Sequence, residues 1–356
     1  MSRHKVLTGL AVALSAGALA ACGSDDKDTS STATSGGTST TATAAKDGPK
    51  IAVLTPAPRN DGGLAQFVIE GAGEAAKSTG GELAAIVDNV TDPQKQIQGL
   101  RNLAEDNDIV IAASGSLNQA TEAVADKYPD TIFIQLLAPT KTFHKNVTAV
   151  VPQLGLNAIV AGAVMATGSK SKKLGVVAGL EIPASTEEVA GISQGAKLVD
   201  PSVDVASTFT GDYNDVGKAK QGGAAQMADG VDQILGDLDS GIRGLTQAAE
   251  AGDAEVYQVF GLTCDASSSI TGSARVSFAA LANSAITDAA AGSLEPGALF
   301  ITLKDPDKMR FEFCPGKGTP EQKKIAQETT DKLVSGEITP DEGVVDPDPG
   351  YSLTTQ

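Results

Sequence analysis

The chain has 356 residues, of which 41% are hydrophobic, 20% are charged and 4% are aromatic, with no tryptophan. Asp and Glu outnumber Lys and Arg by 44 to 27, so the formal net charge at pH 7 is −17. A surface this acidic repels phosphate backbones and argues against nucleic acid as a partner. The length is enough for two compact lobes, each with its own core.

The N-terminal segment has the pattern of a bacterial export signal. A basic stretch at positions 3–5 precedes an apolar run that ends in Leu19-Ala20-Ala21-Cys22. The run is short for a membrane span, and small residues before a cysteine form a lipobox, in which the thiol is acylated and the preceding peptide removed. We therefore expect residues 1–21 to be a lipoprotein signal peptide and Cys22 to be the lipidation site. The alternative is an ordinary secretory peptide that is cleaved elsewhere.

Residues 22–48 are dominated by Ser, Thr, Ala, Gly and Asp and have no apolar periodicity. Such a segment cannot bury a core and is expected to be a flexible tether. A tether behind a multiply acylated cysteine predicts a protein that is lipid-anchored to the cell membrane on its extracytoplasmic face.

From position 50 onward, short β-rich runs alternate with helical patterns. Asp92 before Pro93 places an N-cap acceptor at the start of one of these helices. The first series predicts strands at 51–55, 82–87, 108–113 and 131–135, and helices at 64–78, 93–104 and 117–127.

A second series follows with the same alternation. It predicts strands at 147–151, 173–177, 203–209, 231–235 and 256–261, and helices at 156–167, 185–199, 215–228 and 241–250. The remaining segment predicts helices at 272–290 and 319–335 and strands at 298–302 and 309–313. The helix at 156–167 is apolar but too short to span a bilayer, so we expect it to be buried.

Strands alternating with helices indicate the α/β class, with parallel sheets covered on both faces. Two series predict two Rossmann-like lobes. We expect lobe 1 to be residues 49–150, completed by about 258–292, and lobe 2 to be residues 151–257, completed by about 293–345. Ligands of open parallel sheets bind beyond the carboxyl ends of the strands. The loops expected there are 55–63, 114–116, 136–140, 179–185, 210–215, 236–241 and 262–269.

Two further features concern chemistry. Cys264 and Cys314 are the only thiols after Cys22, and outside the cytoplasm such a pair most often forms a disulfide; two separate buried thiols are the alternative. His144 is the only histidine after the signal and lacks a Gly-x-Ser-x-Gly partner. No EF-hand spacing occurs either. The sequence therefore predicts a binding protein with no catalytic residue, metal or cofactor.

Several segments together resemble the basic membrane protein family of substrate-binding lipoproteins, the purine-nucleoside receptor type. The resemblance extends from Lys50 to about Pro340 and depends on the order and spacing of short motifs rather than on one of them. These motifs are KIAVLT at 50–55, EG at 70–71, ADKYPD at 125–130, IFI at 132–134, AGA at 161–163, KLGVVAG at 173–179, GISQGAK at 191–197, DP at 200–201, GDYND at 211–215, GK at 217–218 and GVD at 230–232.

The resemblance implies a type I periplasmic-binding-protein fold, in which two lobes joined by a hinge close on a ligand. It also implies that a monomer delivers a nucleoside or similar small molecule to an ABC permease. Asp61 matches an acidic residue that bonds a purine edge, and Tyr213 matches an aromatic residue that stacks on the base. The ligand-binding residues expected from this match and from the strand-end loops are Asp61, Ser114, Gly115, Tyr213, Asp239, Ser240, Thr263 and Asp265.

The chain also departs from the family pattern. Leu64 and Ala65 stand where the family has a second aromatic residue and an asparagine. The position at which the family has a basic residue falls near Ala280. Thr263 stands where a ribose-binding carboxylate is expected, with Asp265 as its possible replacement. A lipoprotein that senses or scavenges a non-nucleoside solute without a dedicated transporter is therefore the alternative function.

Overall fold

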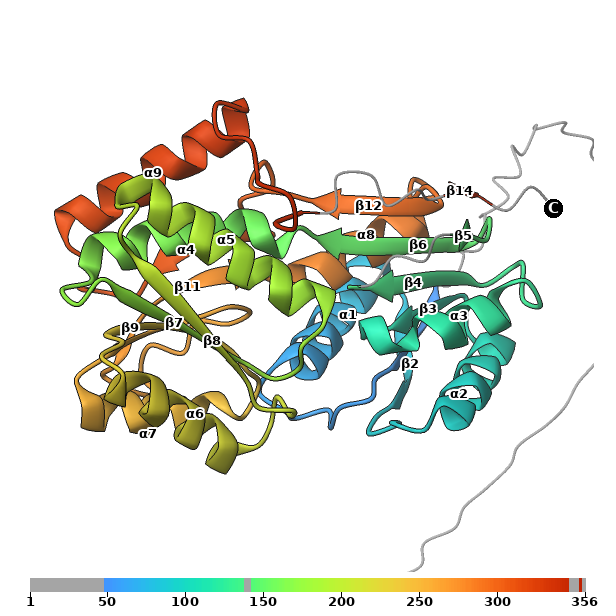
Figure 1. The fold of residues 1–356 in the computed structure, drawn as a ribbon. Helices are drawn as coiled ribbons and strands as arrows, with labels where there is room; N and C mark the ends of the chain where they lie inside the picture. The colour runs from blue at the N-terminus through green and yellow to red at the C-terminus, as the bar shows by residue number, and fades with distance from the viewer. Residues whose placement is uncertain (1–47, 138–141, 346–351, 354–356) are drawn as a thin grey trace, which may run out of the picture. The chain divides into compact units, whose positions relative to one another are not determined.

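Two six-stranded sheets organise the part of the chain that the computed structural model describes, residues 48–137, 142–345 and 352–353 (Figure 1). Sheet 1 is parallel throughout, in the order β12-β6-β4-β3-β1-β2. Sheet 2 has the order β13-β11-β10-β9-β7-β8 and is parallel except at its β13 edge.

The strands of sheet 1 are β1 (Lys50–Leu54), β2 (Glu82–Val87), β3 (Ile109–Ala112), β4 (Ile132–Leu136), β6 (Val147–Pro152) and β12 (Gly297–Ile301). Those of sheet 2 are β7 (Lys173–Ala178), β8 (Asp204–Phe209), β9 (Gln233–Asp237), β10 (Glu255–Gln258), β11 (Ile270–Val276) and β13 (Met309–Phe313). Two short strands, β5 (Thr142–Phe143) and β14 (Ser352–Leu353), pair separately.

Helices cover both faces of each sheet (Figure 1). Sheet 1 packs against α1 (Leu64–Thr79) and α8 (Phe278–Ala291) on one face, and against α2 (Pro93–Asp106) and α3 (Asn118–Ala125) on the other. Sheet 2 packs against α4 (Leu154–Gly168), α5 (Pro183–Val199) and α9 (Pro320–Ser335) on one face, and against α6 (Val216–Ala228) and α7 (Ile242–Gly252) on the other. The predicted α/β class and two-lobed fold are confirmed.

Strand β1 shows why a continuous apolar run becomes a central strand. Ile51 and Val53 pack in the core under α1 and α8, whereas Ala52 and Leu54 pack in the core under α2 and α3. Alternate side chains of a strand point to opposite faces, so a strand buried on both faces needs apolar residues at every position. Helix α2 starts as predicted, because the Asp92 carboxylate accepts the Lys95 N–H at 3.0 Å.

The chain passes between the lobes three times, from β6 to α4, from β11 to α8 and from β12 to β13. The expected boundaries of the completing segments were wrong in two places. Strand β11, inside the 258–292 segment assigned to lobe 1, lies in sheet 2, and β12, inside the 293–345 segment assigned to lobe 2, lies in sheet 1. The cause is that β11 joins β10 in parallel through a connection without a helix.

The helix predicted at 272–290 also began too early. Residues 270–276 form β11, and α8 starts at Phe278 with the Ser277 hydroxyl capping the Ala280 N–H. The strand contains Gly272, Ser273 and Ala274, which carry little β preference but fit between two packed faces.

No helix in the described ranges is long and apolar enough to cross a membrane, and α4 is buried along most of its length. The expected signal peptide at 1–21, the expected lipidation site Cys22 and the expected tether up to residue 47 lie outside the described residues, as does the 138–140 part of one expected loop.

Candidate ligand-binding site

Every candidate ligand-binding residue lies just beyond the carboxyl end of a strand. The parallel strands of each sheet bring these ends to one edge, where binding residues of open α/β sheets are found. The residues follow β1 (Asp61), β3 (Ser114 and Gly115), β8 (Tyr213), β9 (Asp239 and Ser240) and β10 (Thr263 and Asp265). The edges of the two sheets meet where the Asp239 carboxylate from lobe 2 lies against Gly63 of lobe 1.

Asp61 is buried, with 7% of its surface exposed, and its carboxylate caps the first turn of α1. Oδ1 accepts the Gly63 N–H at 2.9 Å and the Gln66 N–H at 3.2 Å, and Oδ2 accepts the Ala65 N–H at 3.3 Å. A carboxylate has about four acceptor positions. The three backbone bonds therefore leave room for roughly one more donor.

Asp239 completes the cap of the same helix from the opposite lobe. Its carboxylate accepts a hydrogen bond from the Leu64 N–H and lies where a side chain at Gly63 would have to be. Burial, followed by the nearby charges of Asp61 and Asp237, raises the pKa of Asp239 to about 7. Two carboxylates thus accept the free N–H groups of residues 63–66, which a helix leaves unsatisfied at its start.

Tyr213 is half-buried, and its ring lies against the backbone of Gly179, where a side chain would overlap the ring atoms. Its carbonyl oxygen accepts the N–H groups of Asp239 and Gly241, both at 3.1 Å. The loops after β7, β8 and β9 are therefore joined at this tyrosine. Burial is the main cause that raises the pKa of the Tyr213 phenol, which keeps it protonated.

The other polar candidates take part in local networks. The Ser240 hydroxyl donates to Asn214 Oδ1 at 2.8 Å, which links the β8 and β9 loops a second time. The Ser114 carbonyl accepts the Gln135 side-chain amide at 2.7 Å, and Gly115 begins a short 3-10 turn, Gly115–Leu117. These hydrogen bonds hold the loops after β3, β8 and β9 in place at the edges of their sheets.

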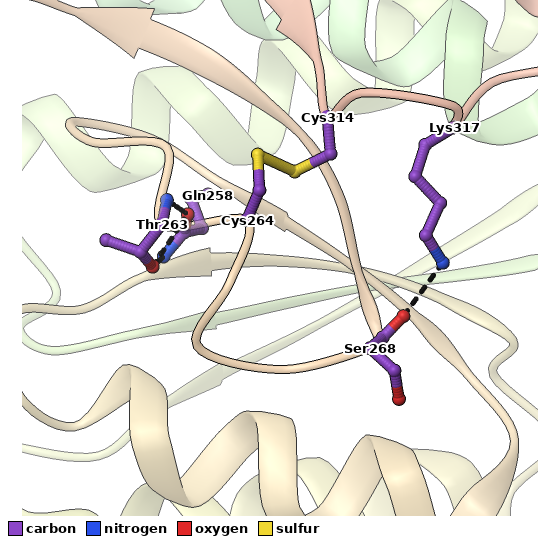
Figure 2. The surroundings of a disulfide bond; sticks show 6 residues. All are labelled: Gln258, Thr263, Cys264, Ser268, Cys314 and Lys317. Carbon is purple, nitrogen blue, oxygen red and sulfur yellow. Dashed lines mark hydrogen bonds between the residues drawn. A yellow bond between two sulfur atoms is a disulfide. The ribbon is translucent and has the colours of Figure 1, made fainter.

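The loop after β10 is held in three ways (Figure 2). Thr263 forms two bonds with Gln258, from its N–H to Oε1 at 2.8 Å and from Gln258 Nε2 to its hydroxyl at 2.9 Å. A disulfide joins Cys264 to Cys314, whose Cα atoms are 5.5 Å apart, and Lys317 Nζ donates to the Ser268 carbonyl at 2.8 Å. Asp265, in the same loop, is exposed.

Comparison with known proteins agrees with this architecture. Residues 49–305 match the model of the family described as ABC transporter substrate-binding protein PnrA-like. The chain belongs to this PnrA-like family. The resemblance drawn from the motifs is thereby confirmed, and the protein is a substrate-binding protein of the ABC transporter type rather than an enzyme.

Two solved structures share the fold of this PnrA-like protein. A solute-binding protein of an ABC transporter system from Aeropyrum pernix K1 has a TM-score of 0.73 at 18% identity, over 84% of this chain and 94% of that chain. A solute-binding protein from Conexibacter woesei DSM 14684 has a TM-score of 0.64 at 22% identity, over 83% and 99%. They confirm the type I periplasmic-binding fold.

A curated relative, the ABC transporter nucleoside-binding protein BmpA of Lactococcus lactis subsp. cremoris, is 28% identical over 153 residues. The match spans 42% of this chain and 43% of that relative, which is less than half of its length.

The structure places the positions that depart from the PnrA-like pattern. Leu64 is half-buried, and Ala65 is buried in the cap of α1 with no polar group to offer a ligand. One turn further along α1, the half-buried Phe67 approaches the loop after β10. A Cβ atom added to Gly261 in that loop would lie 3.4 Å from Phe67 Cζ. An aromatic side chain therefore lies between the lobes even though Leu64 is aliphatic. The sequence reasoning missed Phe67 because it follows the motif position by three residues.

Sequence reasoning also missed a group of buried polar side chains behind Tyr213. Ser185 and Glu188 lie on the buried side of α5, and Asp237 lies at the end of β9. A signal was present, because Ser185, Glu188 and Ile192 fall at the spacing of one helix face. Among the described residues, no group of His, Cys, Asp or Glu has an arrangement that could hold a metal ion.

Proposed function

We propose that the protein is a lipid-anchored receptor, held on the extracytoplasmic face by Cys22, that delivers a purine nucleoside or a close relative to an ABC importer. Membership of the PnrA-like family and the nucleoside-binding relative support this ligand class. The observation that carries the proposal is the meeting of the two strand-end edges, where Asp239 contacts the first turn of α1 beside Asp61 and close to Tyr213. A ligand there would contact both lobes and stabilise their closure.

Each residue would contribute a different contact. The Tyr213 ring, backed by Gly179, would stack on the base, since every base has a π-face. The remaining acceptor position of Asp61 and the Asp239 carboxylate would accept hydrogen bonds from ligand N–H or O–H groups. Ser114, Gly115 and Ser240 would offer further polar groups, and Thr263 and Asp265 would lie toward the sugar.

The test is calorimetric titration of the purified full-length protein in detergent with guanosine, adenosine, inosine and uridine. We expect heat and a thermal shift from at least one purine nucleoside. A protein that gives neither with any of the four would bind another class of solute, and mass spectrometry of whatever co-purifies would then identify it.

Tyr213→Ala should weaken nucleoside binding by about ten- to a hundredfold, because a stacked base is worth roughly 1–3 kcal/mol. Tyr128→Phe is the matched control, since the Tyr128 hydroxyl bonds the Glu105 carboxylate near the surface of lobe 1. Equal affinity of Tyr213→Ala and the control would exclude Tyr213 from the site.

A further inference from the structure

The buried group behind Tyr213 comes from three elements. Ser185 and Glu188 are one turn apart on α5, Asp237 ends β9, and Tyr213 lies in the loop after β8. Only 1% of Ser185, 1% of Glu188 and 2% of Asp237 is exposed. Buried carboxyl groups are costly unless they are hydrogen-bonded or neutral, so the position of each proton matters.

The donors of this group can be assigned one by one. The Ser185 hydroxyl donates its only proton to Asp237 Oδ2 at 2.6 Å. The 3.3 Å contact between Ser185 Oγ and the Tyr213 hydroxyl must then have the phenol as donor. Two successive hydrogen bonds therefore link Tyr213 to the Asp237 carboxylate: the phenol donates to Ser185, and Ser185 donates to Asp237.

The other side of Asp237 requires one more proton. With both carboxyl groups ionised, Asp237 Oδ1 and the two Glu188 oxygens have no hydrogen-bond donor. The two side chains are within hydrogen-bonding reach of each other, so a proton on one Glu188 oxygen can be donated to Asp237, which gives a partner to one oxygen of each side chain. One shared proton also removes the repulsion between two buried charges.

The surroundings favour this arrangement. Burial, then the charges of Asp237 and of Glu187 on the same helix, raise the pKa of Glu188 well above its ordinary value. Burial raises the pKa of Asp237 to about 6, and Ser185 opposes that rise by donating to it. Asp239 lies two residues beyond Asp237, and the charge of Asp237 contributes to the raised pKa of Asp239.

We propose that Glu188 and Asp237 share one proton and, through Ser185, hold the Tyr213 ring in its ligand-binding position. Glu188, Asp237 and Ser185 are positioning residues, and their role in binding rests on the proposed contact between Tyr213 and the ligand. Loss of the shared proton at high pH places two negative charges in contact. Their repulsion weakens the hydrogen bonds that link Asp237 through Ser185 to the Tyr213 phenol. Ligand affinity therefore falls as the pH rises through the ionisation of Glu188.

The arrangement can be tested without any ligand, by carbon-13 NMR of the full-length protein labelled at tyrosine Cζ. The chain has four tyrosines, and Tyr213→Phe assigns the signal of interest. In a pH titration, we expect the Tyr213 signal to shift in one step as the pH rises through the ionisation of Glu188, whose pKa burial raises well above its ordinary value. Glu188→Gln should keep the low-pH position of the signal and abolish the step, because an amide donates to Asp237 at every pH. Ser185→Ala should also abolish the step by breaking the link.

Glu188→Ala should displace the signal at every pH, and Glu122→Gln, an exposed acid on α3, is the control for loss of one charge. A step that persists in Glu188→Gln, or a signal that is the same in Glu188→Ala and wild type, would overturn the proposal. If Glu188→Ala fails to fold, the Gln and Ser185 variants decide alone.

Nucleoside titrations over the same pH range then separate this inference from the proposed function. We expect wild-type affinity to fall by about tenfold from low to high pH, and Glu188→Gln to lose this dependence. Absence of nucleoside binding alongside the expected NMR behaviour would refute the ligand class and leave the proton-sharing pair supported.

Discussion

The disulfide between Cys264 and Cys314 should contribute a large share of the stability. The two cysteines are 50 residues apart in sequence, and the segment between them contains β11, α8, β12 and β13. The bond therefore closes a loop in which the chain leaves lobe 2, builds part of lobe 1 and returns. For a loop of this length, the lost chain entropy of the unfolded state corresponds to about 4 kcal/mol. That is a substantial part of the roughly 5–15 kcal/mol that stabilises a typical domain.

Three variants test this value, namely Cys264→Ala, Cys314→Ala and the double replacement. Each single change breaks the same bond as the double change, so all three should lower the free energy of unfolding by a similar amount. Urea denaturation followed by circular dichroism provides the measurement, and a changed slope would show that the unfolded state has expanded. Intact mass after alkylation under non-reducing, denaturing conditions counts free thiols in the wild type.

Two results would refute this reasoning. Free thiols at both positions in the exported wild-type protein would show that the bond does not form. Losses that add up in the double variant would show that each cysteine contributes through its own packing. The buried Cys314 makes the second outcome a real test, since truncation of a buried side chain has a cost of its own.

Two further predictions concern the anchor and the acid groups. Cys22→Ala should leave an unprocessed or mislocalised protein, as shown by mass and membrane fractionation, and unchanged processing would exclude the lipobox. Asp239, whose pKa is raised to about 7, binds a proton more tightly in the folded than in the unfolded state. The free energy of unfolding should therefore fall by up to about 1.4 kcal/mol per pH unit from about pH 4 to about pH 7 on its account. Asp239→Asn should remove that part of the slope in urea titrations, and an unchanged slope would argue against a buried, titrating Asp239.

Local patterns were sufficient to predict most of the fold. Continuous apolar runs such as 51–54 identify central strands, because both faces of the sheet are covered. Asp92 before Pro93 marks the start of α2, because cap and proline preferences act within a few residues. Strand-end loops then follow from the alternation alone, and with them the edge on which the candidate residues lie.

Features that depend on distant pairing could not be predicted in this way. β11 contains small residues, and it becomes a strand because β10 and β13 pair on its two sides. Likewise, the assignment of β12 to lobe 1 depends on its pairing with β6. The sequence order of these elements carries no local signal of the three crossings between lobes.

Asp61 shows why the role of a site residue is harder to predict than its place. An aspartate shortly before a helix fits both a ligand contact and a helix cap. The structure gives three of its acceptor positions to backbone N–H groups of α1, so a ligand bond from Asp61 would have to use the remaining one. Removing this side chain would therefore disturb the helix as well as any ligand contact, and Asp61→Ala alone cannot separate the two roles.

Glu188 presents the opposite case, in which a local rule is broken and the reason lies elsewhere in the fold. An acid on the buried face of a helix contradicts the usual pattern and is tolerated only if another group shares its proton or charge. That partner is Asp237, 49 positions later in the chain and at the end of a strand in the same lobe, so no local window could reveal it. Buried acids of this kind have a cost in stability, and they are expected where function requires a fixed side chain. Glu188 and Asp237 lie directly behind Tyr213, at the sheet edge where the ligand is proposed to bind, so these destabilising acids are found beside the proposed site.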